Sequence, residues 1–167
     1  MELPLVLEQK FQTLLQRYPI KRSALVPMAL YAQDVFGYVS DDLIAEIARR
    51  IDLSPLHVNE TLAYYSMIRR KPAGKYHVQV CTNVSCMLRG GNEVFDFVQK
   101  KLEIGNKQVT ADGMFSLEEV ECIGACCWAP AIQVNYDFHD DLTPESVANI
   151  LADYRGRANS EGTAKNA

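Results

Sequence analysis

The chain has 167 residues, of which 48% are apolar, and its formal net charge at pH 7 is −4. This length allows one domain or two small ones, and the apolar content is sufficient for a buried core. The acidic balance argues against general binding to nucleic acid or to an anionic membrane surface, because both need a basic face.

The N-terminal residues carry no export signal. Met1-Glu2-Leu3-Pro4 lacks the positive region and the long apolar run of a signal peptide. The longest nearly apolar stretch, residues 24–32, falls short of the ~18 residues that a membrane span needs. We therefore expect a cytoplasmic protein with no direct membrane insertion, which docks at most on a larger membrane assembly.

The first seventy residues follow a helical period. An apolar stripe predicts a first helix, and a second is expected over about residues 23–36 with Gly37 as its stop. Ser40 and Ser54 are predicted to cap a third and a fourth helix, the latter with Pro55 at its first position. The sequence thus predicts an N-terminal helical domain over residues 1–72. The stripe of the first helix consists of Leu7, Phe11, Leu14, Leu15 and Tyr18.

After a linker at Lys71-Pro72-Ala73-Gly74, the apolar period changes to two. Strands are predicted over residues 76–81, 114–122 and 132–138, and a helix is predicted to start near Gly91. Asp112-Gly113 is a hairpin signal. The apolar phase slips between Leu117 and Val120, which predicts a β-bulge.

The C-terminal part of the chain predicts one more helix. Thr143-Pro144 is a helix start, and Leu142 and Val147 are spaced as a hydrophobic staple. The fold class is therefore α+β, with a β-α-β-β-α domain over residues 73–157. Residues 158–167 are small and polar, which predicts a flexible tail.

The five cysteines carry the strongest functional signal. They follow the pattern Cys81-x4-Cys86 and, after 35 intervening residues, Cys122-x3-Cys126, with Cys127 adjacent. An odd number of cysteines without an export signal favours metal binding over disulfides. A [2Fe–2S] cluster takes four thiolates, two on each iron, and close neighbours in the sequence most easily share an iron.

Zinc is the alternative that this spacing leaves open. Zinc also binds four cysteines, usually in pairs spaced by about 2–4 residues. Gly124 relieves steric crowding inside the second loop. The small neighbours Ser85 and Ala125 let backbone N–H groups approach the sulfurs, which suits the negative charge of a cluster. The helix that begins near Gly91 is expected to point its positive end toward the same charge.

Two segments, KYHVQVCTNVSC at residues 75–86 and VECIGACCWAP at residues 120–130, carry a resemblance when read together. With Tyr64-Tyr65-Ser66-Met67, they are similar to the small iron–sulfur subunit of the NADH-oxidising module of respiratory complex I, an NADH:quinone oxidoreductase. The resemblance covers nearly the whole chain. It implies a thioredoxin-like ferredoxin domain with one [2Fe–2S] cluster on Cys81, Cys86, Cys122 and Cys126.

The resemblance also implies a partner. This is the larger flavoprotein subunit, which binds NADH, FMN and a [4Fe–4S] cluster, in an assembly at the inner face of the cytoplasmic membrane. The chain itself has neither a glycine-rich dinucleotide fingerprint nor a phosphate loop, so NADH and FMN are expected on the partner only. The isolated chain is then an electron carrier, and the enzyme is the assembly.

Two other functions stay open at this stage. An NAD-linked hydrogenase or formate dehydrogenase has a similar small diaphorase subunit, and a zinc-stabilised binding module needs the same four cysteines. Cys127 is expected to be a bystander, although Cys122-x4-Cys127 mirrors the spacing of the first pair.

Three further features have modest explanations. The helices of residues 40–67 resemble a DNA-reading helix-turn-helix in size, but the surrounding acidic residues favour a structural bundle or a docking surface. The three histidines are scattered, which disfavours a Rieske-type centre. Trp128 follows the second cysteine pair, where it is expected to shield the metal or to pack on a partner.

Overall fold

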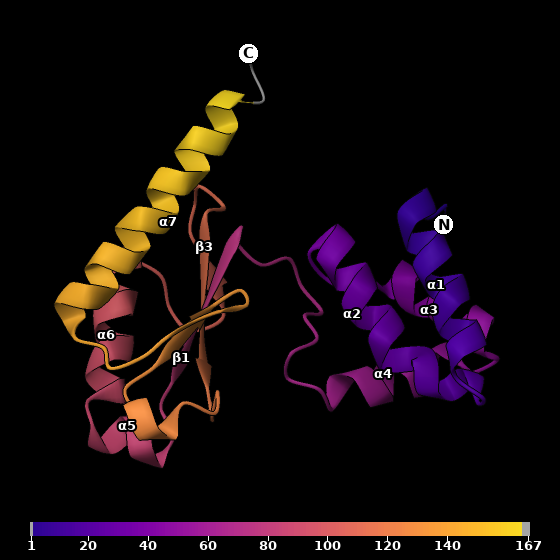
Figure 1. Ribbon diagram of the computed structural model, residues 1–167, viewed down its shortest axis with the longest axis horizontal. Coiled ribbons are helices and arrows are strands. Elements are labelled where there is room, and N and C mark those ends of the chain that lie inside the picture. The colour runs from indigo at the N-terminus through magenta and orange to yellow at the C-terminus, as the bar shows by residue number, and fades with distance from the viewer. Residues whose placement is uncertain (1, 165–167) are drawn as a thin grey trace. The chain divides into compact units, whose positions relative to one another are not determined.

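The computed structural model describes residues 2–164, and the chain divides into two units between Pro72 and Ala73 (Figure 1). Each unit has a core of its own. Helices alone form unit 1, and a sheet with helices forms unit 2, so the predicted α+β class and the order of helices before sheet are confirmed.

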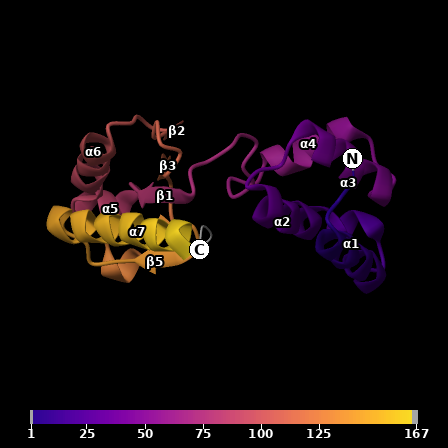
Figure 2. The ribbon, with the colours of Figure 1, turned by 90° about the horizontal axis from the view of Figure 1, so that it is seen from above.

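Unit 1 consists of four α-helices and one short 3₁₀ turn (Figure 2). The predicted signals set their ends. Ser40 Oγ accepts a hydrogen bond from the backbone N–H of Leu43, and Ser54 Oγ accepts one from that of His57. Gly37 ends the second helix with a φ of +82°, which suits glycine. The elements are α1 (Leu5–Arg17), η1 (Lys21–Ala24), α2 (Leu25–Phe36), α3 (Asp41–Ile51) and α4 (Pro55–Ala63).

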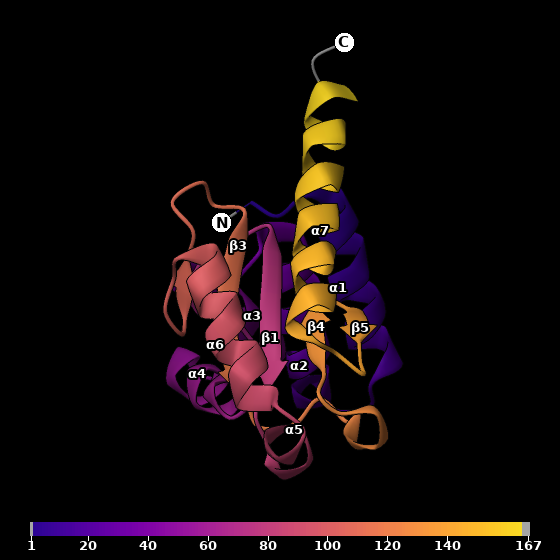
Figure 3. The ribbon, with the colours of Figure 1, turned by 90° about the vertical axis from the view of Figure 1, so that its left-hand side faces the viewer.

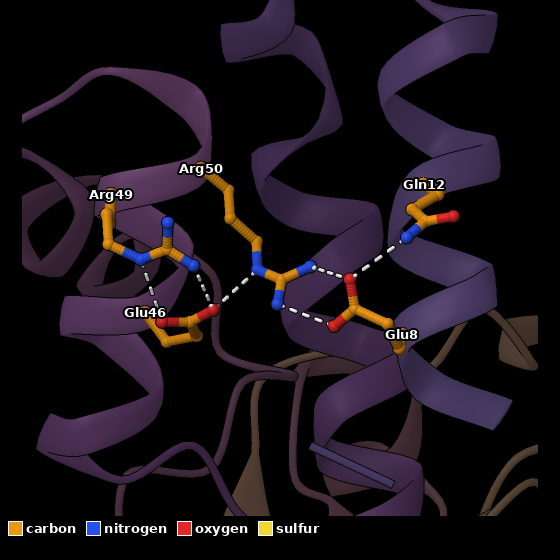
Figure 4. Close-up of polar contacts among 5 residues, drawn as sticks. All are labelled: Glu8, Gln12, Glu46, Arg49 and Arg50. Atoms are coloured by element: carbon orange, nitrogen blue, oxygen red, sulfur yellow. Dashed lines mark hydrogen bonds and ion pairs between the residues drawn. The ribbon is translucent and has the colours of Figure 1, made fainter. Parts of the chain in front are cut away.

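A charged network joins α1 to α3 at the edge of this core (Figure 4). The side chain of Arg50 is 13% exposed, and its Nε lies 2.6 Å from Glu46 Oε1. Its two terminal nitrogens donate to the two carboxylate oxygens of Glu8, at 2.8 and 2.6 Å. Hydrogen bonds from Arg49, helped by those from Arg50, lower the pKa of Glu46 to about 2. The buried carboxylate is therefore held as an anion.

Unit 2 is a five-stranded sheet with helices packed on one face (Figures 1 and 3). The strand order is β2-β3-β1-β4-β5, in which β1 and β3 are parallel and the other pairs are antiparallel. Buried side chains of α6 and α7 cover the alternating apolar residues of β1. The elements are β1 (Tyr76–Cys81), α5 (Val84–Leu88), α6 (Gly91–Leu102), β2 (Gln108–Val109), β3 (Phe115–Val120), η2 (Cys126–Trp128), β4 (Ile132–Val134), β5 (Asp137–His139) and α7 (Pro144–Ala164).

The parallel pair at the centre of the sheet positions the cysteines. Cys81 is the last residue of β1 and lies opposite Val120, the last residue of β3. Because the carboxyl ends of parallel strands meet at one edge, the segments that follow both strands start side by side. The two cysteine motifs therefore leave the sheet at the same place.

The structure corrects two predictions about strands. Residues 115–120 pair one to one with residues 76–81, so there is no bulge in β3. The alternation of apolar residues is interrupted because the strand extends beyond the core after Leu117. The predicted strand over residues 132–138 is instead a hairpin. Asn135 turns the chain with a φ of +55°, so Ile132 and Val134 are buried whereas Phe138 is exposed.

Two helical segments also differ from the prediction. The sequence does not predict α5, although Asn83 caps it by accepting a hydrogen bond from the N–H of Val84 at 2.6 Å. The expected flexible tail at residues 158–167 is helical up to Ala164, because Ala158 still packs on the core of unit 2. Residues 165–167 lie outside the described residues. No helix in the described part of the chain combines the length and the apolar character needed to cross a membrane.

Candidate metal centre

The first cysteine pair is buried. Two hydrogen bonds hold Cys81 in place. Its backbone N–H donates to the carbonyl of Ala131 at 3.2 Å, and its Sγ donates to the carbonyl of Glu121 at 3.4 Å. Cys86 lies on α5. Both side chains are 2% exposed, in a small cluster with Ala129 and Ala131. Sheet and helix thus hold this half of the site rigidly.

The second pair lies in the exposed loop after β3. Cys122 Sγ and Cys126 Sγ are 3.8 Å apart. Gly124 lies between them with a φ of +85°, and its N–H donates to Cys122 Sγ at 3.4 Å. The sequence predicts that Gly124 relieves crowding in this loop; the structure shows that it also brings its own backbone N–H to a sulfur.

The start of α6 touches the backbone of the buried pair. A Cβ on Gly91 would lie 2.8 Å from the carbonyl oxygen of Cys81 and 2.8 Å from the carbonyl carbon of Cys86. Only glycine permits this approach. It places the first turn of α6, with its partial positive charge, against the segments that carry two of the four thiols.

The thiols act on one another electrostatically. Burial raises the pKa of Cys86 to about 11. A hydrogen bond with Cys81 is a smaller cause of the same increase, and the charge of Cys126 adds to it. A hydrogen bond with Cys122 raises the pKa of Cys126, and the charge of Cys81 acts in the same direction. Crowded thiols of this kind are a suitable site for cations, which would replace the thiol protons.

The donor set fits a [2Fe–2S] cluster, which takes four thiolates, one pair on each of two irons. The chain offers two such pairs, one on β1 and α5 and one in the loop after β3. Four thiols are also a donor set that zinc uses. Among the side chains that the structure describes, no three or more Cys, His, Asp or Glu donors are grouped closely enough to hold one ion.

Other residues predicted near the site take the following places. Cys127 is exposed on η2. Trp128 is 62% exposed and is not packed in the core. Two of the histidines make structural hydrogen bonds, His77 with Ser116 and Glu118, and His139 with Tyr154.

Sequence reasoning missed one residue that positions the site. Arg89 follows α5, and its Nε donates to the carbonyl of Ala129 at 2.9 Å. It also lies 3.8 Å from the carboxylate of Asp141. Arg89 thus ties the end of α5 to the segment after the second cysteine pair. Its only signal in the sequence is its position shortly after the first motif.

The sheet edge from which both cysteine motifs start is a candidate site for a thiol-bound iron–sulfur centre. The sequence matches the thioredoxin-like [2Fe-2S] ferredoxin family over residues 11–155. The chain belongs to this family. The match includes most of unit 1 as well as unit 2.

Two relatives are named as the E subunits of NADH-quinone oxidoreductases. The Rickettsia typhi protein is 36% identical over 146 residues, which cover 86% of each chain. The Mycobacterium tuberculosis protein is 36% identical over 149 residues, and these cover 89% of this chain and 59% of its own. A crystal structure of an NAD+-reducing [NiFe]-hydrogenase shares the fold, with a TM-score of 0.71 at 18% identity, over 80% of this chain and 23% of the hydrogenase chain.

Proposed function

We propose that this chain is an electron-transfer subunit of an NADH–quinone oxidoreductase and that it holds one [2Fe–2S] cluster on Cys81, Cys86, Cys122 and Cys126. The observation that carries the proposal is that both cysteine motifs leave the sheet at the edge where β1 and β3 end, in a member of a [2Fe–2S] family. Family membership also favours the cluster over the zinc-stabilised module.

The residues around the thiols prepare the site for negative charge. The N–H of Gly124 donates to one sulfur, and a backbone hydrogen bond from Ala131 favours the thiolate of Cys86. The first turn of α6 adds its dipole at Gly91. A [2Fe–2S] cluster supplies one-electron transfer. Because Cys122 and Cys126 are exposed whereas Cys81 and Cys86 are buried, a cluster held here would be accessible to a redox partner from the side of the second pair.

The partner in this proposal is the flavoprotein subunit that binds NADH, FMN and a [4Fe–4S] cluster. The names of the curated relatives support a place in such an assembly. The flavin takes two electrons from hydride, and this chain offers a one-electron acceptor beside it. Through the assembly the chain is placed at the inner face of the cytoplasmic membrane.

The test is metal analysis of the chain purified without oxygen. We expect about two irons and two sulfides per chain, and one S = 1/2 EPR signal only after reduction. NADH should reduce the chain only when the flavoprotein subunit is added. Zinc without sulfide or signal would overturn the cluster, and reduction by NADH alone would overturn the division of roles.

One observation favours a second assembly. The fold match to the NAD+-reducing hydrogenase supports the equivalent diaphorase role in a hydrogenase or formate dehydrogenase. The higher identity to the NADH-quinone oxidoreductase relatives favours the first assignment. Gentle purification of the native complex separates the two, because a quinone-reducing complex and a hydrogenase differ in their other subunits.

A further inference from the structure

Unit 1 presents apolar side chains on a segment that has no regular secondary structure. After α4, Tyr64 is 87% exposed, Tyr65 is 37% exposed and Met67 is 56% exposed. The two tyrosine rings meet edge to face, with centroids 5.7 Å apart. Clustered aromatic and methionine side chains at a surface are typical of protein–protein contacts.

The segment is held in one conformation by a buried glutamine. Gln33 on α2 is 3% exposed; its Nε2 donates to the carbonyl of Met67 at 3.0 Å, and its Oε1 accepts from the N–H of Arg69 at 2.6 Å. Ile68 between them is buried in the core of unit 1. With the backbone fixed on both sides, Met67 is directed outward without further ordering. Such preorganisation lowers the entropic cost of binding.

A polar cavity adjoins this segment. It measures about 390 Å³ and is lined by Arg22, Ser23, Leu25, Val26, Thr61 and Tyr65. The hydroxyl of Thr61 already donates to the carbonyl of His57, so the donors left for a ligand are Arg22, Ser23 and Tyr65. Within the described residues Arg22 has no ion-pair partner. A cation beside hydroxyl donors is complementary to a carboxylate.

We propose that Arg22, Tyr64, Tyr65 and Met67 form a docking surface for the flavoprotein partner, and that an acidic side chain of that partner enters the cavity beside Arg22. This inference rests on the proposed function, which supplies the partner. Unit 1 holds none of the five cysteines, yet the family match includes residues 11–72. A unit that binds no cluster but is retained with the cluster domain is explained by a role in assembly.

The test measures the affinity of the full chain, with its cluster, for the purified FMN-loaded flavoprotein subunit. Arg22→Glu and Met67→Ala should each weaken binding by about tenfold or more, since one reverses a charge and the other removes an apolar contact. Added salt should weaken the binding of the unaltered chain more than that of Arg22→Glu. Two matched controls lie outside the proposed surface: Lys100→Glu on α6, and Leu5→Ala on α1, where the Leu5 side chain is 73% exposed. The affinity of each control for the flavoprotein subunit should stay within about twofold of that of the unaltered chain.

Iron and sulfide content, measured on every variant, keeps this test apart from the proposed function. Loss of the cluster in the unaltered chain would defeat the proposed function, whereas wild-type affinity in both surface variants with full clusters would overturn the docking surface alone. An unaltered chain that holds its cluster but does not bind the flavoprotein would also overturn it.

A photo-crosslinker at Tyr64 identifies the occupant. With p-benzoylphenylalanine in place of Tyr64, we expect a crosslink to a flavoprotein peptide that contains Asp or Glu. A crosslink to a second copy of the chain, or none in the mixed complex, would contradict the proposal.

Discussion

The approach of α6 to the cysteine segments can be tested by adding one methyl group, in Gly91→Ala. Inside a helix this change ordinarily stabilises by ~0.5–1 kcal/mol, which is the upper limit of the gain for Gly91 at the first helical position. Here the new Cβ would lie 2.8 Å from two backbone atoms, against 3.4 Å for the start of ordinary contact, so a backbone must move by about 0.6 Å. Overpacking of this kind costs ~1–3 kcal/mol. We expect a net destabilisation of unit 2 by ~1–2 kcal/mol.

The expected loss concerns the metal site as well as stability, because the atoms in the way belong to Cys81 and Cys86. Thermal unfolding followed by circular dichroism measures the first effect, and iron and sulfide per chain measure the second. Gly156→Ala is the matched control: Gly156 lies within α7, has ordinary helical geometry, and has nothing within 4 Å of the added Cβ. It should stabilise by ~0.5–1 kcal/mol. If Gly91→Ala stabilised equally and kept a full cluster, the reasoning would be refuted.

Three further predictions concern the ligands and unit 1. Cys127→Ser should keep iron and sulfide at the wild-type level and Cys126→Ser should lose them; the reverse result would make Cys127 the fourth ligand. The hydrogen bond from Arg49 lowers the pKa of Glu46 from an ordinary 4.5 to about 2. The ionised Glu46 therefore stabilises the fold of unit 1 fully above pH 4.5, and this stabilisation is lost as the pH falls toward 2. Urea unfolding of unit 1 should show up to ~3 kcal/mol of this loss, and Glu46→Gln should remove it. Arg50→Met breaks contacts to Glu8 and Glu46 and should cost ~2–4 kcal/mol at pH 7, since Glu46 keeps Arg49; a cost under ~1 kcal/mol would show that the network stabilises little.

Local signals were sufficient for most of unit 1. The caps at Ser40 and Ser54 and the stop at Gly37 depend on side-chain and backbone chemistry within a few residues. The buried faces follow from the helical period. The charged network between α1 and α3 was not predictable, because Glu8 and Arg50 are far apart in the sequence and meet only when the helices pack.

The errors in unit 2 arose where a local pattern had two physical causes. Alternation from Ile132 to Phe138 is compatible with one strand, but the left-handed conformation of Asn135 folds it into a hairpin. Asn135 is secured by distant partners: its Oδ1 accepts from the N–H of His77 at 2.9 Å, and its Nδ2 donates to the carbonyl of Lys75 at 3.1 Å. Such a turn depends on the neighbouring strand as well as on the asparagine itself.

The four cysteines could be selected from spacing and resemblance, but their arrangement could not. It depends on the parallel pairing of β1 with β3, which brings Cys81 beside the start of the second motif. The resulting halves differ: Cys81 and Cys86 are fixed by strand and helix in an apolar cluster, while Cys122 and Cys126 lie on an exposed loop that Gly124 makes compact. In the proposed site, the pair on strand and helix would hold one iron, and the loop pair would hold the other.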